Sequence, residues 1–349
     1  MPSRAAILRA VGACARSPVI SRLLRSFYRR RANIVYYHGI WPTRSAALAL
    51  FYGIDLDTFR DDMKTLCRYF RPVSLDEVLR ANDAGETEGK PPIAVTFDDG
   101  SDLAGSGAAD VLGDLGIPAT TFVVLACVGN RHLMWQHKFS AIQGMRGDDI
   151  FVRQFNRLTE KLAPGSSVRS PKEHVARARL WPMERKDEYA DALWKACDMP
   201  LVGEFLEEHK PYVNWDDLED WRRRGHEIGL HTRTHPFCSR LNAREIEAEI
   251  VEPARELRER LHLTSVPFAY PFGDRLPREQ EEGVAAMGRL SCLLGIRGLS
   301  PRGTPPYHLD RARAEAGLHD SVFGRPLLHA GAERHRRILR RNFSRWTRS

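Results

Sequence analysis

Residues 93–100 read Ile-Ala-Val-Thr-Phe-Asp-Asp-Gly, an apolar run that passes directly into two carboxylates and a glycine. A short, continuously apolar run of this kind is typical of a strand that is buried on both faces of a parallel sheet. Five other runs share this composition, and helical patterns separate several of them: 34–37, 120–124, 227–230, 266–270 and 292–296. The alternation of strand and helix predicts an α/β protein with a parallel sheet or barrel.

Polar or turn residues follow four of these predicted strands. In parallel α/β folds the carboxyl ends of the strands point to one rim, and that rim holds the active site. We therefore expect four segments to meet in space: His38-Gly39, Asp98-Asp99-Gly100, His231-Thr-Arg-Thr-His235 and Pro271-Phe-Gly-Asp274.

The acidic and histidine residues of this rim have the composition of a metal site. Two adjacent carboxylates repel each other unless a cation separates their roles, and a divalent metal does so by binding one and leaving the other free to accept a proton. Asp-Asp-Gly is equally good turn chemistry. His231 and His235 are four residues apart, so a helical turn would place both imidazoles on one face. Two imidazoles and one carboxylate leave an open coordination position, as a hydrolytic zinc site requires.

One long stretch interrupts the alternation of strands and helices. Residues from about 130 to 213 show helical periodicity and no clear strand. Because this stretch is far longer than a connecting loop, it predicts a helical insertion between two barrel strands. The expected organisation is a basic arm at 1–32, a barrel at 33–324 that contains the insertion, and a second basic arm at 325–349.

Positive charge is concentrated at the two ends of the chain. Residues 1–40 carry +8 and residues 325–349 carry +7 of an overall +8, so the rest of the chain carries −7. A nucleic-acid enzyme usually carries its positive charge on the folded surface around its site, which argues against a nucleic-acid partner. Apolar residues alternate with arginines in the first arm, so it fits either peripheral contact with an anionic membrane or an ordinary basic helix.

The compartment is predicted from what the sequence lacks. The N-terminal arm contains no uninterrupted apolar region of the kind that secretion signals have, and no stretch reaches about 18 apolar residues. The six cysteines form no Cys-x-x-Cys pair, which excludes a zinc ribbon or a thioredoxin motif and favours a reduced compartment. We expect a cytoplasmic protein that lies at the inner face of the membrane.

These motifs resemble those of the polysaccharide deacetylases with a NodB homology domain, carbohydrate esterase family 4. Thr-Phe-Asp-Asp-Gly at 96–100 resembles the first motif of the family, and His-Thr-Arg-Thr-His at 231–235 resembles the second. Tyr-Pro-Phe-Gly at 270–273 is similar to the third motif, and the segments 215–230 and 37–40 resemble further parts of the family pattern. The resemblance covers about 33–128 and 213–300, and implies a distorted (β/α) barrel of about seven strands.

The resemblance also implies roles for individual residues. Asp99, His231 and His235 would bind one divalent metal, most often zinc, and Asp98 would be the general base. The backbone N–H of Tyr270 would stabilise the oxyanion of the tetrahedral intermediate.

Two further residues are expected to bind substrate, Pro271 and Trp135. Trp135 opens the insertion and could stack on a sugar ring, although a tryptophan is more often part of a core.

The chain departs from the family pattern at two points. The third motif of the family often begins with an arginine that orients the base, and no arginine precedes Tyr270. The Leu-x-x-His motif that supplies a general acid is not found in clean context. The candidates for that acid are His38, His308, His319 and His329.

The function expected from the resemblance is metal-dependent removal of N-acetyl groups from an amino sugar. The substrate would be a bacterial surface polysaccharide or its lipid-linked precursor, that is, an N-acetylated glycan or glycolipid. Two alternatives stay open: hydrolysis of another amide, such as a formamide or an imide, on the same fold, and an inactive scaffold that binds glycan.

Overall fold

The computed structural model describes residues 25–41, 47–48, 51–83, 89–162, 165, 167–315 and 318. Most of the two basic arms, including all of 325–349, therefore lies outside the described residues, as do His319 and His329. None of the helices in the described ranges combines the length and the apolar character that crossing a membrane requires.

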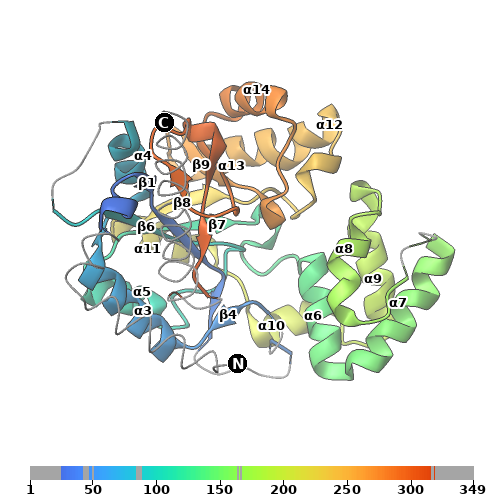
Figure 1. Ribbon diagram of the computed structural model, residues 1–349. Coiled ribbons are helices and arrows are strands. Elements are labelled where there is room, and N and C mark those ends of the chain that lie inside the picture. Colours follow the sequence, from blue (N-terminus) through green and yellow to red (C-terminus); the bar gives the residue numbers. More distant parts are fainter. Residues whose placement is uncertain are drawn as a thin grey trace, which may run out of the picture.

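The centre of the molecule is a parallel sheet (Figure 1) in which all six predicted runs form strands. Neighbouring strands pair in parallel around the sheet, and nearly every side chain on them is buried. The strands follow in this order: β2 (Ile34–Tyr37), β6 (Pro92–Phe97), β7 (Ala119–Val123), β8 (Glu227–Leu230), β9 (Val266–Ala269) and β10 (Leu290–Gly295).

The sheet closes through one short segment. Strand β12 (Leu309–Asp310) pairs with β10, and β13 (Ala312–Arg313) pairs with β2 on the opposite edge. A single residue, Arg311, separates these two strands. Residues 309–313, called the closing segment below, therefore take the place of a seventh strand and join the two edges of the sheet. The predicted distorted (β/α) barrel is confirmed.

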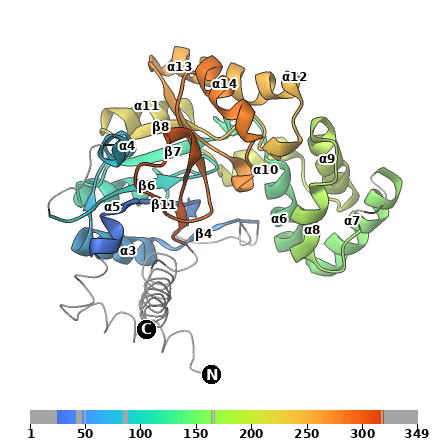
Figure 2. The ribbon, with the colours of Figure 1, turned by 45° about the horizontal axis from the view of Figure 1, so that its top comes forward.

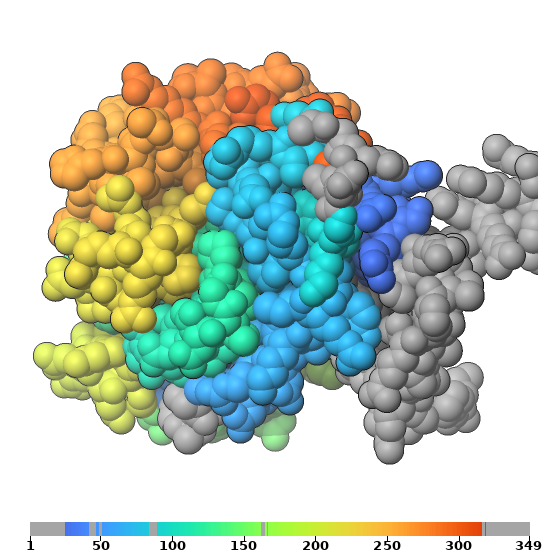
Figure 3. Space-filling view, turned by 90° about the vertical axis from the view of Figure 1, so that its left-hand side faces the viewer, coloured from blue at the N-terminus to red at the C-terminus, as the bar shows by residue number. Residues whose placement is uncertain are grey.

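Helices cover the outside of the barrel, and each begins where the sequence supplies a capping residue or an apolar face. Asp55 caps α3 (Leu56–Tyr69), which buries Phe59, Met63 and Leu66 against the sheet. Figure 3 views this side, where blue, green and yellow residues form a continuous surface. The other covering helices are α4 (Leu75–Asp83), α5 (Ala108–Asp114), α11 (Trp215–Arg223), α12 (Ala243–Ile246), α13 (Glu252–Leu261) and α14 (Arg278–Gly288).

Between β7 and β8 the described chain is helical and contains no strand. It forms a group of helices with a separate apolar core, which includes Trp135, Phe139 and Trp181. Figures 1 and 2 both show most of this group standing at one side of the barrel. Its helices are α6 (Trp135–Arg146), α7 (Asp148–Leu162), α8 (His174–Ala178), α9 (Lys186–Ala196) and α10 (Val202–His209).

Short strands complete the structure outside the barrel wall. β1 and β11 pair in antiparallel fashion, β3 pairs with β4, and β5 pairs with the start of β6. Their bounds are Arg31–Ala32 for β1, Gly39–Ile40 for β3, Gly53–Ile54 for β4, Arg71–Pro72 for β5 and Ser300–Pro301 for β11.

Candidate metal centre and active site

The four predicted strand-end segments meet at one rim of the barrel, around a cavity of about 170 Å³. They reach this rim because β2, β6, β8 and β9 run in parallel and end on the same side. The cavity is lined by Tyr36, His38, Tyr52, Asp98, Gln136, His231, His235, Tyr270, Phe272, Ile296 and Arg313.

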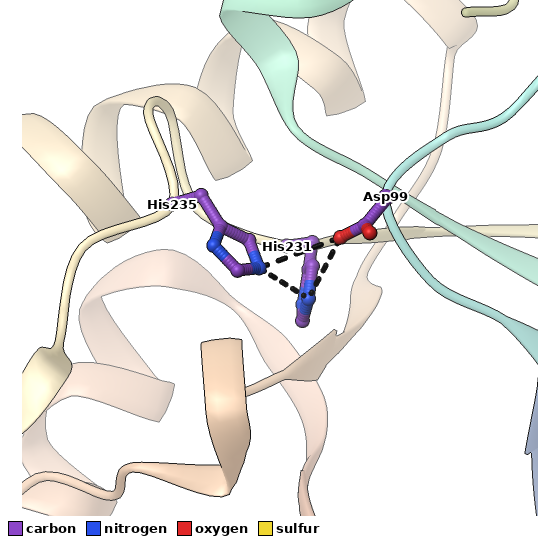
Figure 4. A group of neighbouring side chains, drawn as sticks. All are labelled: Asp99, His231 and His235. Carbon is purple, nitrogen blue, oxygen red and sulfur yellow. Dashed lines mark hydrogen bonds and ion pairs between the residues drawn. The ribbon is translucent and has the colours of Figure 1, made fainter. Parts of the chain in front are cut away.

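The three predicted metal ligands lie together (Figure 4), and two of them, His231 and His235, line this cavity. Asp99 Oδ1 is 3.4 Å from His235 Nε2 and 3.7 Å from His231 Nε2, and the two histidine nitrogens are 3.2 Å apart. Ligands bound tetrahedrally to zinc at 2.0–2.1 Å lie about 3.3 Å from one another. The spacing of the three donor atoms therefore fits a tetrahedral ion with one open position.

The electrostatics of the three side chains also fit a cation. All three are buried, and neither oxygen of Asp99 has a hydrogen-bond partner among the described residues. Burial lowers the pKa of both His231 and His235, so each ring is neutral and can offer a lone pair. Burial alone would raise the pKa of Asp99, but the nearby histidines, His137 foremost, hold it below its usual range. An ionised carboxylate without partners in the interior is costly unless a cation binds it.

Two of the three ligands, and one residue between the histidines, have a left-handed backbone conformation. Asp99 has φ 70°, Thr232 has φ 69° and His235 has φ 62°, although none of them is a glycine. Such left-handed conformations cost free energy and persist only where the surrounding structure enforces them.

Hydrogen bonds hold both histidines in place. The Nδ1 of His231 lies 2.7 Å from the carbonyl of Ala269, which directs Nε2 toward the centre. The loop that carries His235 is held from behind, because the carbonyl of His235 accepts the indole N–H of Trp135 at 2.9 Å. Glu249, in a π-helical turn, accepts the backbone N–H groups of Arg233 and Thr234.

Asp98, the predicted base, is clamped by an arginine that the sequence analysis missed. Arg311 donates two hydrogen bonds to it, from Nη1 to Oδ1 at 2.6 Å and from Nη2 to Oδ2 at 2.8 Å. The side chain of Arg311 is fully buried, with its guanidinium near the rings of Tyr36 and Phe122. No arginine precedes Tyr270, as the sequence shows, and the arginine that orients Asp98 instead comes from residues 309–313, which close the barrel. No local motif marks it.

His38 is the general-acid candidate that lines the cavity. Burial alone would lower the pKa of His38, but the carboxylate of Glu315, 2.6 Å from Nδ1, raises it to about 9. Glu315 also pairs with Arg313 at 2.9 Å. By contrast, His308 pairs with Glu281 at 2.8 Å and does not line the cavity.

The expected oxyanion donor has another role. The backbone N–H of Tyr270 donates to the carbonyl of Leu294 at 3.0 Å, because Tyr270 continues the pairing of β9 with β10 by one residue. This N–H is therefore not available to an oxyanion in the cavity. Pro271 has no N–H, so the next one along the chain belongs to Phe272, which lines the cavity with φ 57°.

The two residues expected to bind substrate are both buried away from the cavity. Trp135 is 0% exposed in the core of the insertion, where it packs near Phe139 and Trp181, so its ring is not available to a sugar. Pro271 is also buried and does not line the cavity. Their neighbours Gln136 and Phe272 do line it.

Comparison with known proteins found one family model that matches part of the chain. Residues 184–288 match the family model described as polysaccharide deacetylase, a segment that includes the second motif and the Tyr-Pro-Phe-Gly segment. No curated protein matches the chain.

Solved structures match the chain at low sequence identity. The Streptococcus pyogenes deacetylase PplD, in complex with acetate, is 15% identical with a TM-score of 0.54, over 84% of this chain and 98% of that one. IcaB from Ammonifex degensii is 19% identical over 80% and 89%, with a TM-score of 0.47. At these identities the PplD match shows a shared fold.

Proposed function

We propose that this chain hydrolyses N-acetyl groups of an amino sugar with the help of a divalent metal. The match of residues 184–288 to the polysaccharide deacetylase family model supports the proposal. The single observation that carries this proposal is the arrangement of the cavity. It combines a clamped carboxylate at Asp98 with a separate group of metal-binding type at Asp99, His231 and His235.

The residues of the cavity divide the reaction between them. Asp99, His231 and His235 would hold the divalent cation, which when bound would supply Lewis acidity for hydrolysis of the acetamide. Asp98 accepts the proton of the attacking water, and Arg311 fixes both carboxylate oxygens so that the base cannot rotate away. Phe272 presents the first backbone N–H beyond β9 that could donate to the developing oxyanion.

The leaving amine needs a proton, and we assign its delivery to His38. With a pKa of about 9, His38 is protonated at neutral pH, and it lines the same cavity as Asp98. Glu315 holds the ring through Nδ1, which leaves Nε2 for the substrate. The products are acetate and a free amino sugar.

The proposal is tested by acetate release from N-acetylglucosamine oligomers, beside Asp98→Asn and with bound metal measured by mass spectrometry. Asp98→Asn should abolish turnover and retain the metal. Retained turnover in this variant contradicts the assignment of the base. Activity of metal-free protein on a formamide or an imide would favour the alternative amidase, and glycan binding without acetate release would favour a scaffold.

We further propose that the substrate is a bacterial surface polysaccharide or its lipid-linked precursor, met at the cytoplasmic face of the membrane. The support is the concentration of positive charge in the two arms. Full-length protein should bind vesicles that contain phosphatidylglycerol and should not bind vesicles of phosphatidylcholine alone. Equal behaviour with both kinds of vesicle contradicts this proposal.

A further inference from the structure

Helix α6 of the insertion begins beside the metal centre. Trp135 donates to the carbonyl of His235, Gln136 lines the cavity, and His137 Nε2 lies 3.6 Å from Asp99 Oδ2. The first contact supports the loop that carries His235, and Gln136 forms part of the cavity wall. The third joins the insertion to a metal ligand, and the reaction proposed above makes no use of it.

The ring of His137 is fixed between two aromatic rings. Phe51 stacks on it with the centroids 4.0 Å apart, and Tyr212 lies on it at 5.6 Å and an interplanar angle of 14°. The residue is 4% exposed. His137 therefore cannot swing into solvent, and its Nε2 stays directed at Asp99.

The hydroxyl of Tyr212 determines which nitrogen of His137 carries hydrogen. This hydroxyl accepts the backbone N–H of Met134 at 3.2 Å and lies 2.7 Å from His137 Nδ1. The Cys127 thiol is also within reach of the hydroxyl, but sulfur is a weak acceptor. The hydroxyl hydrogen therefore points to Nδ1, and the ring hydrogen lies on Nε2, facing Asp99.

The two oxygens of Asp99 have different neighbours. Oδ1 is the oxygen within ion-pair distance of His231 and His235, whereas Oδ2 is the one that faces His137. Neither makes a hydrogen bond in the present geometry. The gap from His137 to Oδ2 exceeds a hydrogen bond by about 0.5 Å, and contacts of this kind tighten when the ligand binds.

We propose that His137 is a positioning residue for the metal: its Nε2–H donates to Asp99 Oδ2 and holds Oδ1 toward the ion. The inference rests on the metal dependence of the proposed function. Partners that orient a ligating side chain in this way contribute about 10- to 100-fold to metal affinity. The insertion thereby takes part in building the metal centre, in addition to forming one wall of the cavity.

The test measures the Kd for Zn²⁺ of the full chain by competition with a chromogenic chelator. His137→Phe keeps a ring between Phe51 and Tyr212 and removes the donor, so Kd should rise about 10- to 100-fold. His137→Gln retains an N–H donor and should recover part of the affinity. Tyr212→Phe removes only the hydroxyl that sets the tautomer and should raise Kd by a smaller factor.

His174→Phe is the matched control. His174 belongs to the same insertion and packs against Phe139 and Phe151, away from the cavity, so its replacement should leave Kd unchanged. Thermal unfolding without metal checks that each variant folds. Wild-type affinity in His137→Phe, or an equal loss in His174→Phe, overturns the positioning role. Absence of zinc binding by the wild type overturns instead the metal dependence on which it rests.

Discussion

Replacing Arg311 with methionine tests whether the closing segment of the barrel, residues 309–313, holds the proposed base, Asp98, in position. The substitution removes two hydrogen bonds of 2.6 and 2.8 Å and leaves the Asp98 carboxylate, 3% exposed, without its cationic partner. Breaking a buried ion pair by removing one member costs about 3–5 kcal/mol. We therefore expect the free energy of unfolding of Arg311→Met to fall by about this amount.

A double-mutant cycle separates the ion pair from the loss of packing. Asp98→Asn removes the carboxylate and leaves the buried guanidinium of Arg311 without an anionic partner, so it should also lower the free energy of unfolding. In the double variant neither charge remains, so its loss of unfolding free energy should be well below the sum of the losses in the two single variants. Urea unfolding followed by tryptophan fluorescence measures all four proteins, in the absence of metal so that metal affinity does not enter the result.

Activity provides the second readout of the same clamp. Arg311→Lys keeps the charge but cannot present two parallel N–H groups, so we expect kcat to fall while zinc is still bound. Additive losses in the cycle, or an Arg311→Met protein within about 0.5 kcal/mol of the wild type, would refute the reasoning. Wild-type kcat in Arg311→Lys would show that charge alone is sufficient.

Three further substitutions probe other parts of the structure. Burial raises the pKa of Asp62 to about 7, although the hydrogen bond from Tyr37 acts to lower it. Between about pH 4 and pH 7 the folded state therefore binds a proton that the unfolded state has lost, so the free energy of unfolding falls as the pH rises through this range. Asp62→Asn should therefore gain stability over the wild type across this window in urea titrations, and an equal gain at pH 3 would contradict this explanation. Gln136→Leu removes a buried amide oxygen that has no hydrogen-bond partner in the described part of the chain, so the free energy of unfolding should hold or rise while KM for the glycan rises. An unchanged KM would exclude contact with substrate. Gly229→Ala would place a Cβ 2.4 Å from the ring of Phe122. It should lower the free energy of unfolding by about 1–3 kcal/mol, measured by thermal unfolding. Wild-type stability would contradict a rigid contact at this position.

The residues that the sequence analysis expected at one rim, and that the structure brings together there, share a local signal. Asp98 and Asp99 stand directly after a buried strand, and His231 and His235 follow another, so the rule for parallel strands was sufficient to bring the two segments together. The start of α12 carries a local signal of the same kind, because Asn242 and Glu245 have the spacing of a capping box and form one in the structure.

The errors concern features that depend on the length of an element or on its surroundings. The N–H of Tyr270 pairs within the sheet because β9 continues its pairing by one residue, and no residue type signals that extension. Trp135 occupies a core instead of a binding surface because the insertion has enough apolar residues to bury it. A tryptophan beside a site is compatible with either environment until the packing is known.

Arg311 was missed for a further reason, which bears on how the site is formed. Its backbone N–H donates to the carbonyl of Gly295 at 3.0 Å, and the strands on its two sides pair with opposite edges of the sheet. The guanidinium can reach Asp98 only when both pairings exist, since two-residue strands carry no conformational preference strong enough to place it alone. Closure of the barrel and orientation of the base are therefore one structural event. A variant that weakens the pairing of residues 309–313 should lose the geometry of Asp98 before it loses the Asp99, His231 and His235 group, because the strands that precede those ligands, β6 and β8, are joined through β7 independently of residues 309–313.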